Sequence, residues 1–249
     1  ALNNAIGRFY NAMGVELRQG YGLTETSPVI SVNRENCNNP VTVGQPIPGL
    51  QIRLGDIEEL QVKGPTVMKG YWKRPDATAE VFTEDGWFRT GDQADLSDAG
   101  RIRIKGRIKE IIVTSTGEKI PPTDMELAIQ TDPLFEQVMV VGEARPFITA
   151  LAVVNEAEWE KFAKEFNVDP SDDRMLMRRD IRMAALKRLK KAASRFPQYG
   201  IPRNIRLLKE HWTVDNGCLT VTMKLRRPII REKLRAEIDE LYTVPQNNV

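Results

Sequence analysis

Apolar and polar residues alternate in short runs through most of the first half of the chain. A helical pattern at the start leads into a Gly/Thr-rich turn within QGYGLTETSPVIS, and the region from Thr42 to about Lys105 carries the runs VTVGQPIPGLQIRL, ELQVKGP, GWFRTGD and GRIRIKG. Alternation that is cut by glycine and proline is typical of half-buried strands. We therefore expect a β-rich, strongly twisted or barrel-like unit, interrupted by one short helix that Pro75 and Asp76 open.

Beyond Lys109 the pattern changes to helical periodicity mixed with apolar strands. Glu126 stands three residues after Thr123, which predicts a capping box at the start of a helix over 123–129. VMVVGE and ITALAVVN predict two strands joined by a turn at 144–147. The remaining predicted elements are amphipathic helices over 156–166 and 175–194, a strand at NIRLLKE and a last helix over 228–241.

These two patterns predict an α+β fold in two parts. A β-rich unit over 1–108 precedes a region in which strands and helices mix, and that mixture indicates a compact α+β unit over 109–249. A chain of 249 residues is long enough to bury a core in each part. The domain boundary is accordingly expected near Lys109.

Composition narrows the classes of function. The 36 Lys and Arg stand against 34 Asp and Glu, and a net charge of +2 is too small to indicate a nucleic-acid or membrane surface by itself. Cys37 and Cys218 lack CxxC spacing, which excludes a disulfide framework and suits a reducing cytoplasm. No apolar run approaches the roughly 20 residues that span a bilayer. The lone His211 argues against a histidine base or metal cluster, and the sequence contains neither a P-loop nor a GxGxxG motif.

The segment YGLTET is the first candidate for chemistry. Gly20 and Gly22 flank an aromatic residue and let the backbone approach a ligand, while the face of Tyr21 can stack on a purine. The Thr24 hydroxyl can reach a phosphate, and the Glu25 carboxylate can hold Mg²⁺. On spacing alone, a strand-end turn with a capping threonine is the simpler interpretation.

Three further candidates lie at predicted turns. Asp92 ends the glycine turn TGD, where it can accept both hydroxyls of a ribose or form an Asx-turn with its own backbone. In GRIKE, Arg107 can bind a phosphate or ribose oxygen and Lys109 can act as a hinge, although a solvated hairpin turn explains the same charges. Lys224 in LTVTMKLRR can be a mobile charge for a carboxylate or phosphate, with a basic surface turn as the alternative.

The predicted helix near 174–195 carries many basic residues and few acids. Such a face could meet phospholipid head groups or another anionic ligand. Ile181, Ala185 and Leu189 recur at helical spacing, however, so that a helix with one buried and one solvated face is the favoured interpretation. The basic residues are Arg174, Arg178, Arg179, Arg182, Lys187, Arg188, Lys190, Lys191 and Arg195.

The order of these motifs resembles a known family more specifically than any one motif does. YGLTET, GQPIPGLQIRL, KGYWKRPDATAEVF, GWFRTGD, GRIRIKGRIKEIIVTSTGEKIPP and LTVTMKLRR follow one another over nearly the whole chain. Together they resemble the carboxyl-terminal part of an AMP-forming acyl-CoA synthetase of the adenylate-forming superfamily. GRIKEIIVTSTGEKIPP with TMKLRR is most similar to long-chain fatty-acid–CoA ligases. The resemblance implies that 1–108 is the last part of a large adenylation lobe and 109–249 a mobile smaller lobe.

The resemblance also implies a nucleotide site made from the first of these motifs. Tyr21 would stack on adenine, with Gly20 and Gly22 lining the nucleotide. Thr24 would contact phosphate, and Glu25 would ligate Mg²⁺. The substrates that follow from the resemblance are a fatty acid, ATP and CoA, which react through an acyl-AMP.

The remaining candidates receive roles from the same resemblance. Asp92 would accept the ribose hydroxyls, and Arg107 would bind nearby nucleotide oxygens. Lys224 would bridge the acyl carboxylate and the α-phosphate as the catalytic residue. Lys109 falls on the hinge about which the small lobe moves between the half-reactions, and Gly117 would join the tunnel for the pantetheine arm of CoA.

The sequence departs from the family pattern at several points. Val221 stands where proline is common, Thr114 where some members carry lysine, and IRLGDIEELQVKG lacks the usual glycine in its turn. The Ser/Thr/Gly-rich phosphate loop and most of the large lobe are not in this sequence. We therefore expect a fragment that is inactive by itself.

The expected function is that of a cytoplasmic long-chain fatty-acid–CoA ligase that uses ATP and Mg²⁺, with peripheral contact to the inner face of a membrane left open. A related alternative loads the acyl group onto a carrier protein. A third is a non-catalytic module whose basic helix docks on a membrane or nucleic acid; the ligase itself needs no nucleic-acid partner. Acyl chain length and oligomeric state are not readable from these residues.

Overall fold

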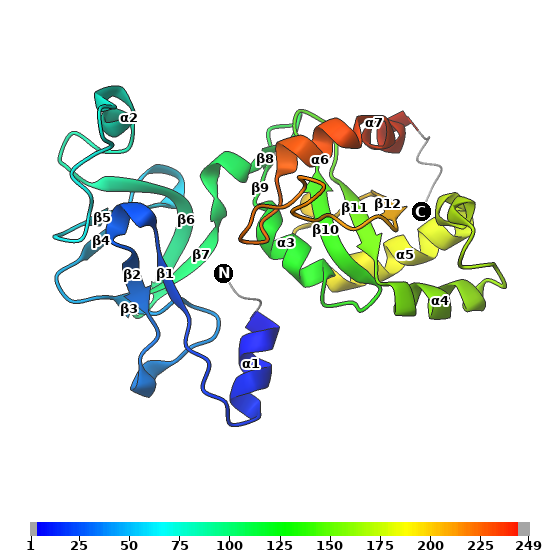
Figure 1. The fold of residues 1–249 in the computed structure, drawn as a ribbon, viewed down its shortest axis with the longest axis horizontal. Helices are drawn as coiled ribbons and strands as arrows, with labels where there is room; N and C mark the ends of the chain where they lie inside the picture. The colour runs from blue at the N-terminus through cyan, green and yellow to red at the C-terminus, as the bar shows by residue number, and fades with distance from the viewer. Residues whose placement is uncertain (1–3, 244–249) are drawn as a thin grey trace. The chain divides into compact units, whose positions relative to one another are not determined.

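The computed structural model describes residues 4–243, and the chain divides into two compact units, Ala1–Glu110 and Ile111–Val249. Each unit is drawn in Figure 1, the first in blue to green and the second in green to red. The first is mostly strands and the second mixes strands with helices, which confirms the predicted α+β class. The assignment of 1–108 and 109–249 to the lobes of a larger enzyme stays a prediction.

Antiparallel strands dominate the first unit, in the orders β1–β2–β3 and β4–β5–β6–β7. Side chains alternate between core and surface along β6, so that Phe88, Thr90, Asp92 and Ala94 are all buried on one side. The helices and strands of this unit are α1 (Asn4–Ala12), β1 (Gly20–Gly22), β2 (Val29–Val32), β3 (Gln45–Pro46), β4 (Gln51–Leu54), β5 (Glu59–Lys63), α2 (Pro75–Glu80), β6 (Phe88–Asp98) and β7 (Arg101–Arg107), with 3₁₀ turns η1 (Thr24–Thr26), η2 (Glu35–Cys37), η3 (Asp56–Glu58) and η4 (Ile108–Glu110).

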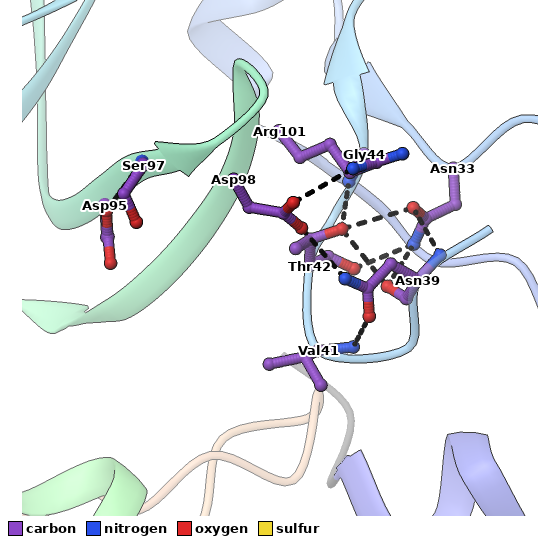
Figure 2. A network of polar contacts seen from close by, with 9 residues as sticks. All are labelled: Asn33, Asn39, Val41, Thr42, Gly44, Asp95, Ser97, Asp98 and Arg101. Carbon is purple, nitrogen blue, oxygen red and sulfur yellow. Dashed lines mark hydrogen bonds and ion pairs between the residues drawn. The ribbon is translucent and has the colours of Figure 1, made fainter. Parts of the chain in front are cut away.

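A polar network that is buried at Asn33 and Thr42 and exposed at Asp98 ties the β2–β3 connection to the β6–β7 hairpin (Figure 2). Asn33 Nδ2 donates to the Thr42 carbonyl oxygen at 2.7 Å, and the Thr42 hydroxyl lies 3.3 Å from Asn33 Oδ1. Asn39 Nδ2 reaches Asp98 at 2.9 Å, and the same carboxylate pairs with Arg101 at 3.0 Å. Because Asp98 ends β6 and Arg101 begins β7, these contacts link the connection between β2 and β3 to that hairpin.

The second unit is built on a sheet in the order β10–β11–β12, with β10 and β11 antiparallel and β11 and β12 parallel. The predicted turn at 144–147 does join β10 and β11. The helices and strands of this unit are β8 (Ile112–Val113), β9 (Lys119–Ile120), α3 (Pro122–Ile129), β10 (Phe135–Val141), β11 (Thr149–Val154), α4 (Glu156–Glu165), α5 (Arg179–Ala192), β12 (Asn204–Leu208), α6 (Arg227–Lys233) and α7 (Arg235–Thr243), with 3₁₀ turns η5 (Asp173–Met177) and η6 (Gln198–Gly200).

Strand β11 is buried along its whole length because apolar clusters cover both faces of this sheet. Ala150, Ala152 and Val154 belong to the larger cluster, which contains residues of α3, α4 and α5. Leu151 and Val153 belong to the other, which contains residues of α6 and α7. Figure 1 shows α6 and α7 on the opposite side of the sheet from α4 and α5. A strand buried on both faces explains why ITALAVVN reads as a continuous apolar run.

Several predicted helices differ from those observed. The capping box is wrong, because α3 begins at Pro122 after a Pro121 cap that makes no side-chain hydrogen bond, and Glu126 is buried and turned to other partners. The predicted helix at 175–194 is η5 followed by α5, with Arg178 between them in an extended conformation. The predicted helix at 228–241 is α6 followed by α7.

The turn between β4 and β5 shows how the chain manages without the expected glycine. Ile57 and Glu58 adopt φ angles of 53° and 60°, in the left-handed region that glycine normally supplies. A β-branched residue is costly there, so the turn carries strain at Ile57.

Within residues 4–243, no helix is both long enough and apolar enough to cross a bilayer.

Candidate functional site

Tyr21, Asp92 and Arg107, three residues singled out from the sequence, converge in the first unit. The Tyr21 hydroxyl donates a hydrogen bond to Asp92 Oδ2, and Arg107 Nε lies 3.2 Å from Asp92 Oδ1. The carboxylate is thus held at both oxygens by groups from β1 and β7. A local turn at Asp92 does not account for these two contacts.

Strand pairing explains why Asp92 and Arg107 meet. The two residues are direct partners in the antiparallel register of β6 and β7. Gly91, just before Asp92, has a φ of 71°, a conformation that favours glycine. The Thr90 hydroxyl donates to the Leu60 carbonyl oxygen at 2.7 Å and accepts from the Asp92 N–H at 3.1 Å. These contacts fix the direction in which the carboxylate points.

Burial and charge define the chemistry of this cluster. The Asp92 side chain is only 5% exposed, whereas that of Arg107 is 49% exposed. Burial of Tyr21, and then the adjacent Asp92 carboxylate, raise the pKa of the phenol well above its usual value, so the phenol stays neutral and remains a donor. A mostly buried carboxylate that a phenol and a guanidinium both contact is an acceptor of fixed orientation.

The turn after β1 is held by Thr26. Its buried hydroxyl donates to the carbonyl oxygens of Leu23 and Pro28, each at 2.9 Å, and accepts from the Leu23 N–H at 3.1 Å. A Cβ at Gly22 would lie 1.7 Å from the Pro28 oxygen, so the chain itself requires glycine there. The segment YGLTET thus forms a turn after β1 that Thr26 holds in place, and Thr24 is exposed at the start of η1.

Tyr71, which the sequence did not single out, contacts the predicted metal ligand Glu25. Its hydroxyl donates to Glu25 Oε1 at 2.8 Å, and the Met68 N–H donates to the Glu25 carbonyl oxygen at 2.8 Å. Burial and the hydrogen bond to Glu25 raise the pKa of the Tyr71 phenol. Nothing local in KGYWKRP indicates this contact, because its partner lies 46 positions away in the chain.

The residues around Glu25 fit Mg²⁺ in one particular way. No group of three or more His, Cys, Asp or Glu that could hold a metal occurs among residues 4–243. Mg²⁺ is commonly bound through one or two carboxylates together with substrate phosphates. Glu25, with its carboxylate oriented by Tyr71, fits a magnesium ion that enters with a nucleotide.

Lys109 and Gly117 lie on either side of the division between the units. Lys109 is exposed within η4, the last element of the first unit. Gly117 is exposed in the turn between β8 and β9, where its N–H donates to the Thr114 carbonyl oxygen at 2.9 Å. The Ser115 N–H in the same turn donates to the Arg145 carbonyl oxygen at 3.0 Å. The hinge and tunnel roles stay predictions.

Lys224 lies in a tight exposed loop, which we call the lysine loop, residues 219–225. Leu219 and Leu225 form an antiparallel bridge at its base. The Thr220 N–H donates to the Lys224 carbonyl oxygen at 2.9 Å, and the Lys224 N–H donates to Thr220 Oγ1 at 3.1 Å. Val221 at the tip is 85% exposed. The loop therefore presents Lys224 to solvent from a defined backbone.

A second pair that the sequence missed lies just after the lysine loop. Arg227 forms a bidentate pair with Glu126, with N–O distances of 2.7 and 2.6 Å. Glu126 Oε1 also accepts the Val140 N–H at 2.7 Å. The only sequence signal was a glutamate on a helix face that is otherwise buried, next to Met125 and Ile129.

The basic helix is engaged within its own unit. Arg178 pairs with Asp180 at 2.5 Å, and Arg188 pairs with Asp132 at 2.5 Å. The stripe formed by Ile181, Ala185 and Leu189 is buried in the core, as its spacing predicted. These contacts favour a helix that serves the fold over one that docks on a membrane or nucleic acid.

Two family descriptions match separate parts of the chain. Residues 1–72 match "AMP-binding enzyme", and residues 109–245 match "AMP-binding enzyme C-terminal domain". The second match covers more than half of the chain. Tyr21 and Glu25 lie in the first match, and Lys109, Gly117 and Lys224 in the second.

Curated relatives are much longer than this chain. It is 36% identical over 249 residues to "Long-chain-fatty-acid--CoA ligase FadD15" of Mycobacterium bovis, an alignment that covers 97% of this chain and 40% of that protein. It is 33% identical to "Long-chain-fatty-acid--[acyl-carrier-protein] ligase AEE15, chloroplastic" of Arabidopsis thaliana, covering 96% of this chain and 34% of that protein. The chain thus spans well under half the length of these relatives.

A solved structure shares the fold. The adenylation domain of the carboxylic acid reductase from Segniliparus rugosus, in complex with AMP and a co-purified carboxylic acid, aligns with a TM-score of 0.75 at 25% identity. The alignment covers 95% of this chain and 37% of that one.

Proposed function

The chain belongs to the family of AMP-binding enzymes, and from this premise we propose that it is part of an ATP-dependent long-chain fatty-acid–CoA ligase. In the proposed reaction, a fatty-acid carboxylate attacks the α-phosphorus of ATP, pyrophosphate leaves, and an acyl-AMP forms. The CoA thiol then attacks the acyl carbonyl and displaces AMP. Identity of 36% to a long-chain ligase from Mycobacterium bovis supports the substrate class.

The observation that carries the proposal is the convergence of Tyr21, Asp92 and Arg107. Strand β1 and the distant β6–β7 hairpin supply an aromatic ring, a buried carboxylate and a cation in direct contact. These are the groups needed for a base, a ribose diol and the neighbouring nucleotide oxygens. In the proposal, Asp92 accepts the ribose hydroxyls, Tyr21 stacks on adenine, and Gly20 and Gly22 line the nucleotide.

In the proposal, the ATP phosphates and their Mg²⁺ contact residues that follow β1. Thr24 is exposed and offers a hydroxyl, and Glu25 supplies the carboxylate for Mg²⁺, held in place by Tyr71. When bound, Mg²⁺ would neutralise charge on the phosphates. The part of this chain is to hold the Glu25 carboxylate at a fixed orientation before the nucleotide arrives.

Lys224 is proposed to act on the first half-reaction. Its ammonium group would bridge the acyl carboxylate and the α-phosphate and offset negative charge as the pentacovalent centre forms. Lys109 is proposed as the hinge between the two half-reactions, and Gly117 as part of the passage for the pantetheine arm. Such chemistry relies on positioning and charge, which suits a chain with a single histidine.

A second candidate replaces CoA by a carrier protein. The observation that favours it is the 33% identity to an acyl-carrier-protein ligase from Arabidopsis thaliana. Both reactions share the acyl-AMP, so Tyr21, Asp92 and Lys224 keep their roles. Supplying the full-length protein with either CoA or holo-carrier protein separates the two, because thioester formed only on the carrier would reject the CoA ligase.

The full-length protein tests the proposal through its first half-reaction. Fatty-acid-dependent exchange of labelled pyrophosphate into ATP reports acyl-AMP formation without CoA. Lys224→Ala should lower the exchange rate by about 100-fold or more, the range seen when one transition-state donor is lost. Lys187→Ala, at an exposed lysine of α5, is the matched control and should keep the rate. Exchange that is absent from the wild type, or unchanged in Lys224→Ala, would reject the proposal.

The proposed compartment is the cytoplasm. Cys37 and Cys218 are both free thiols, and free thiols suit a reducing environment. Peripheral contact with the inner face of a membrane would give such an enzyme access to long-chain fatty acids.

A further inference from the structure

The position of Lys224 depends on the two ends of the lysine loop. The loop tip is exposed, with Val221 85% and Met223 68% exposed, so little of the surrounding unit supports it from outside. Its internal hydrogen bonds, such as that from the Met223 N–H to the Thr220 carbonyl oxygen at 2.8 Å, fix its shape. They do not fix its place relative to the sheet, which is decided at the base.

The two ends of the loop are anchored by different forces. At the first end, Cys218 and Leu219 are buried in the apolar cluster on one face of the sheet. Apolar contacts are non-directional. The directional contacts at this end, such as that from the Leu219 N–H to the Thr213 carbonyl oxygen at 2.9 Å, stay within the connection that precedes the loop. At the second end, the Arg226 N–H donates to the Cys218 carbonyl oxygen at 2.8 Å, and Arg227 follows as the first residue of α6.

Arg227 provides the directional anchor. Its guanidinium binds both carboxylate oxygens of Glu126, and the two side chains are only 15% and 7% exposed. Glu126 is in turn fixed by the Val140 N–H of β10 at 2.7 Å. A planar guanidinium that meets a carboxylate at two points defines both distance and angle. The pair therefore links the end of the lysine loop to α3 and to the sheet.

We infer that Glu126 and Arg227 are positioning residues for Lys224, which set the place from which its ammonium group acts in acyl-AMP formation. This inference rests on the proposed function. Arg227 stands three residues after Lys224 and cannot turn without moving the base of the loop. The two side chains contact each other and the backbone of β10, and in this inference their effect on the reaction runs through Lys224.

The test compares the two half-reactions in the full-length enzyme. Arg227→Lys keeps the charge and loses the two-point contact, and Glu126→Gln keeps the shape and an acceptor for the Val140 N–H. Each should lower kcat for pyrophosphate–ATP exchange at least tenfold and leave the KM for ATP within about twofold. Thioester formation from supplied acyl-AMP and CoA should stay within twofold, because Lys224 acts only in the first half-reaction.

Comparing the two half-reactions of the same variant also distinguishes a positioning role from misfolding. A variant that merely weakens the fold would lower both half-reactions together, and that outcome overturns the inference, as does an unchanged exchange rate. The matched control is Arg188→Lys, at the bidentate pair with Asp132 in the same unit, which should not separate the half-reactions. If Lys224→Ala abolishes exchange while Arg227→Lys does not, only this inference fails. If Lys224→Ala has no effect, the proposed function fails first.

Discussion

The hydroxyl of Tyr21 donates its hydrogen bond to the carboxylate of Asp92, a residue 71 positions further along the chain. Arg107 approaches the other oxygen of the same carboxylate. Contacts among the three side chains restrict their rotamers, and such restriction lowers the ordering cost of binding a ligand.

Asp92→Asn should raise the KM for ATP about tenfold in the full-length enzyme, since hydrogen bonds to a charged group contribute about 1.5–3 kcal/mol. Tyr21→Phe keeps the ring and should have a smaller effect, of about threefold. Initial rates of pyrophosphate exchange at varied ATP provide the measurement. Asp95→Asn, further along β6, is the matched control. An unchanged KM in Asp92→Asn would remove Asp92 from the nucleotide site.

Tyr71→Phe should make the enzyme need more magnesium. The variant removes the hydroxyl that orients Glu25, and loss of a residue that supports a metal ligand costs about tenfold or more in metal affinity. The measurement is the MgCl₂ concentration that gives half the maximal exchange rate at fixed ATP. Tyr199→Phe, in η6 of the other unit, serves as the control. Equal magnesium requirements in wild type and Tyr71→Phe would contradict the assignment.

Lys109→Pro should lower the second half-reaction and spare the first. Arg227→Lys should do the reverse. Proline restricts φ to about −65°, so a rotation of the backbone at this position is blocked. Acyl-AMP formation should persist, while thioester formation from supplied acyl-AMP should fall at least tenfold. Lys109→Ala leaves the backbone free to rotate and should retain both. Equal loss of both half-reactions in Lys109→Pro would argue against a hinge here.

Gly22, after β1, and Gly91, before Asp92, should respond differently to alanine. A Cβ at Gly22 meets the Pro28 oxygen at 1.7 Å, so Gly22→Ala must displace backbone and should cost about 3 kcal/mol or more. A Cβ at Gly91 meets nothing within 4 Å, and Gly91→Ala should cost only about 1–2 kcal/mol for its left-handed φ of 71°. Urea unfolding of the 249-residue chain measures both. Equal losses would show that the turn after β1 can relax.

Acid should weaken the second unit through Asp132. Burial favours the neutral carboxyl, but hydrogen bonds from Arg188 and from the Leu134 N–H outweigh it and lower the pKa of Asp132. A lowered pKa in the folded state stabilises the fold above the unfolded value of about 4, and this stabilisation is lost as the pH falls through the folded pKa. Asp132→Asn should cost about 1–3 kcal/mol at pH 7 and show a flatter decline below pH 4. Unfolding free energies from pH 7 to pH 2 test this, and parallel profiles would contradict it.

The sequence predicted elements better than it predicted contacts. Alternation along β6 follows from a strand with one buried face, and the continuous apolar run of β11 from a strand with two. Asp92 and Arg107 were each recognised, but their pairing across β6 and β7 depends on strand register. Register is set by the whole sheet and is not readable from either motif.

The capping box failed for a tertiary reason. Glu126 has the right spacing from Thr123, but its carboxylate is buried beside β10. A buried charge is costly unless a group of opposite charge pairs with it. That cation is Arg227, 101 positions away. The contact of Tyr71 with Glu25 could not be predicted from the sequence for the same reason, because it joins segments that only folding brings together.

The sheet of the second unit has a mechanical consequence. Leu219, at the root of one functional loop, is packed on one side of β11, while Ile112 and Ile120, which flank the turn at Gly117, are packed on the other. The same three-stranded sheet therefore supports the lysine loop on one face and the turn at Gly117 on the other. If Lys224 and Gly117 act in different half-reactions, as proposed, one sheet supports both without any change in its strand pairing.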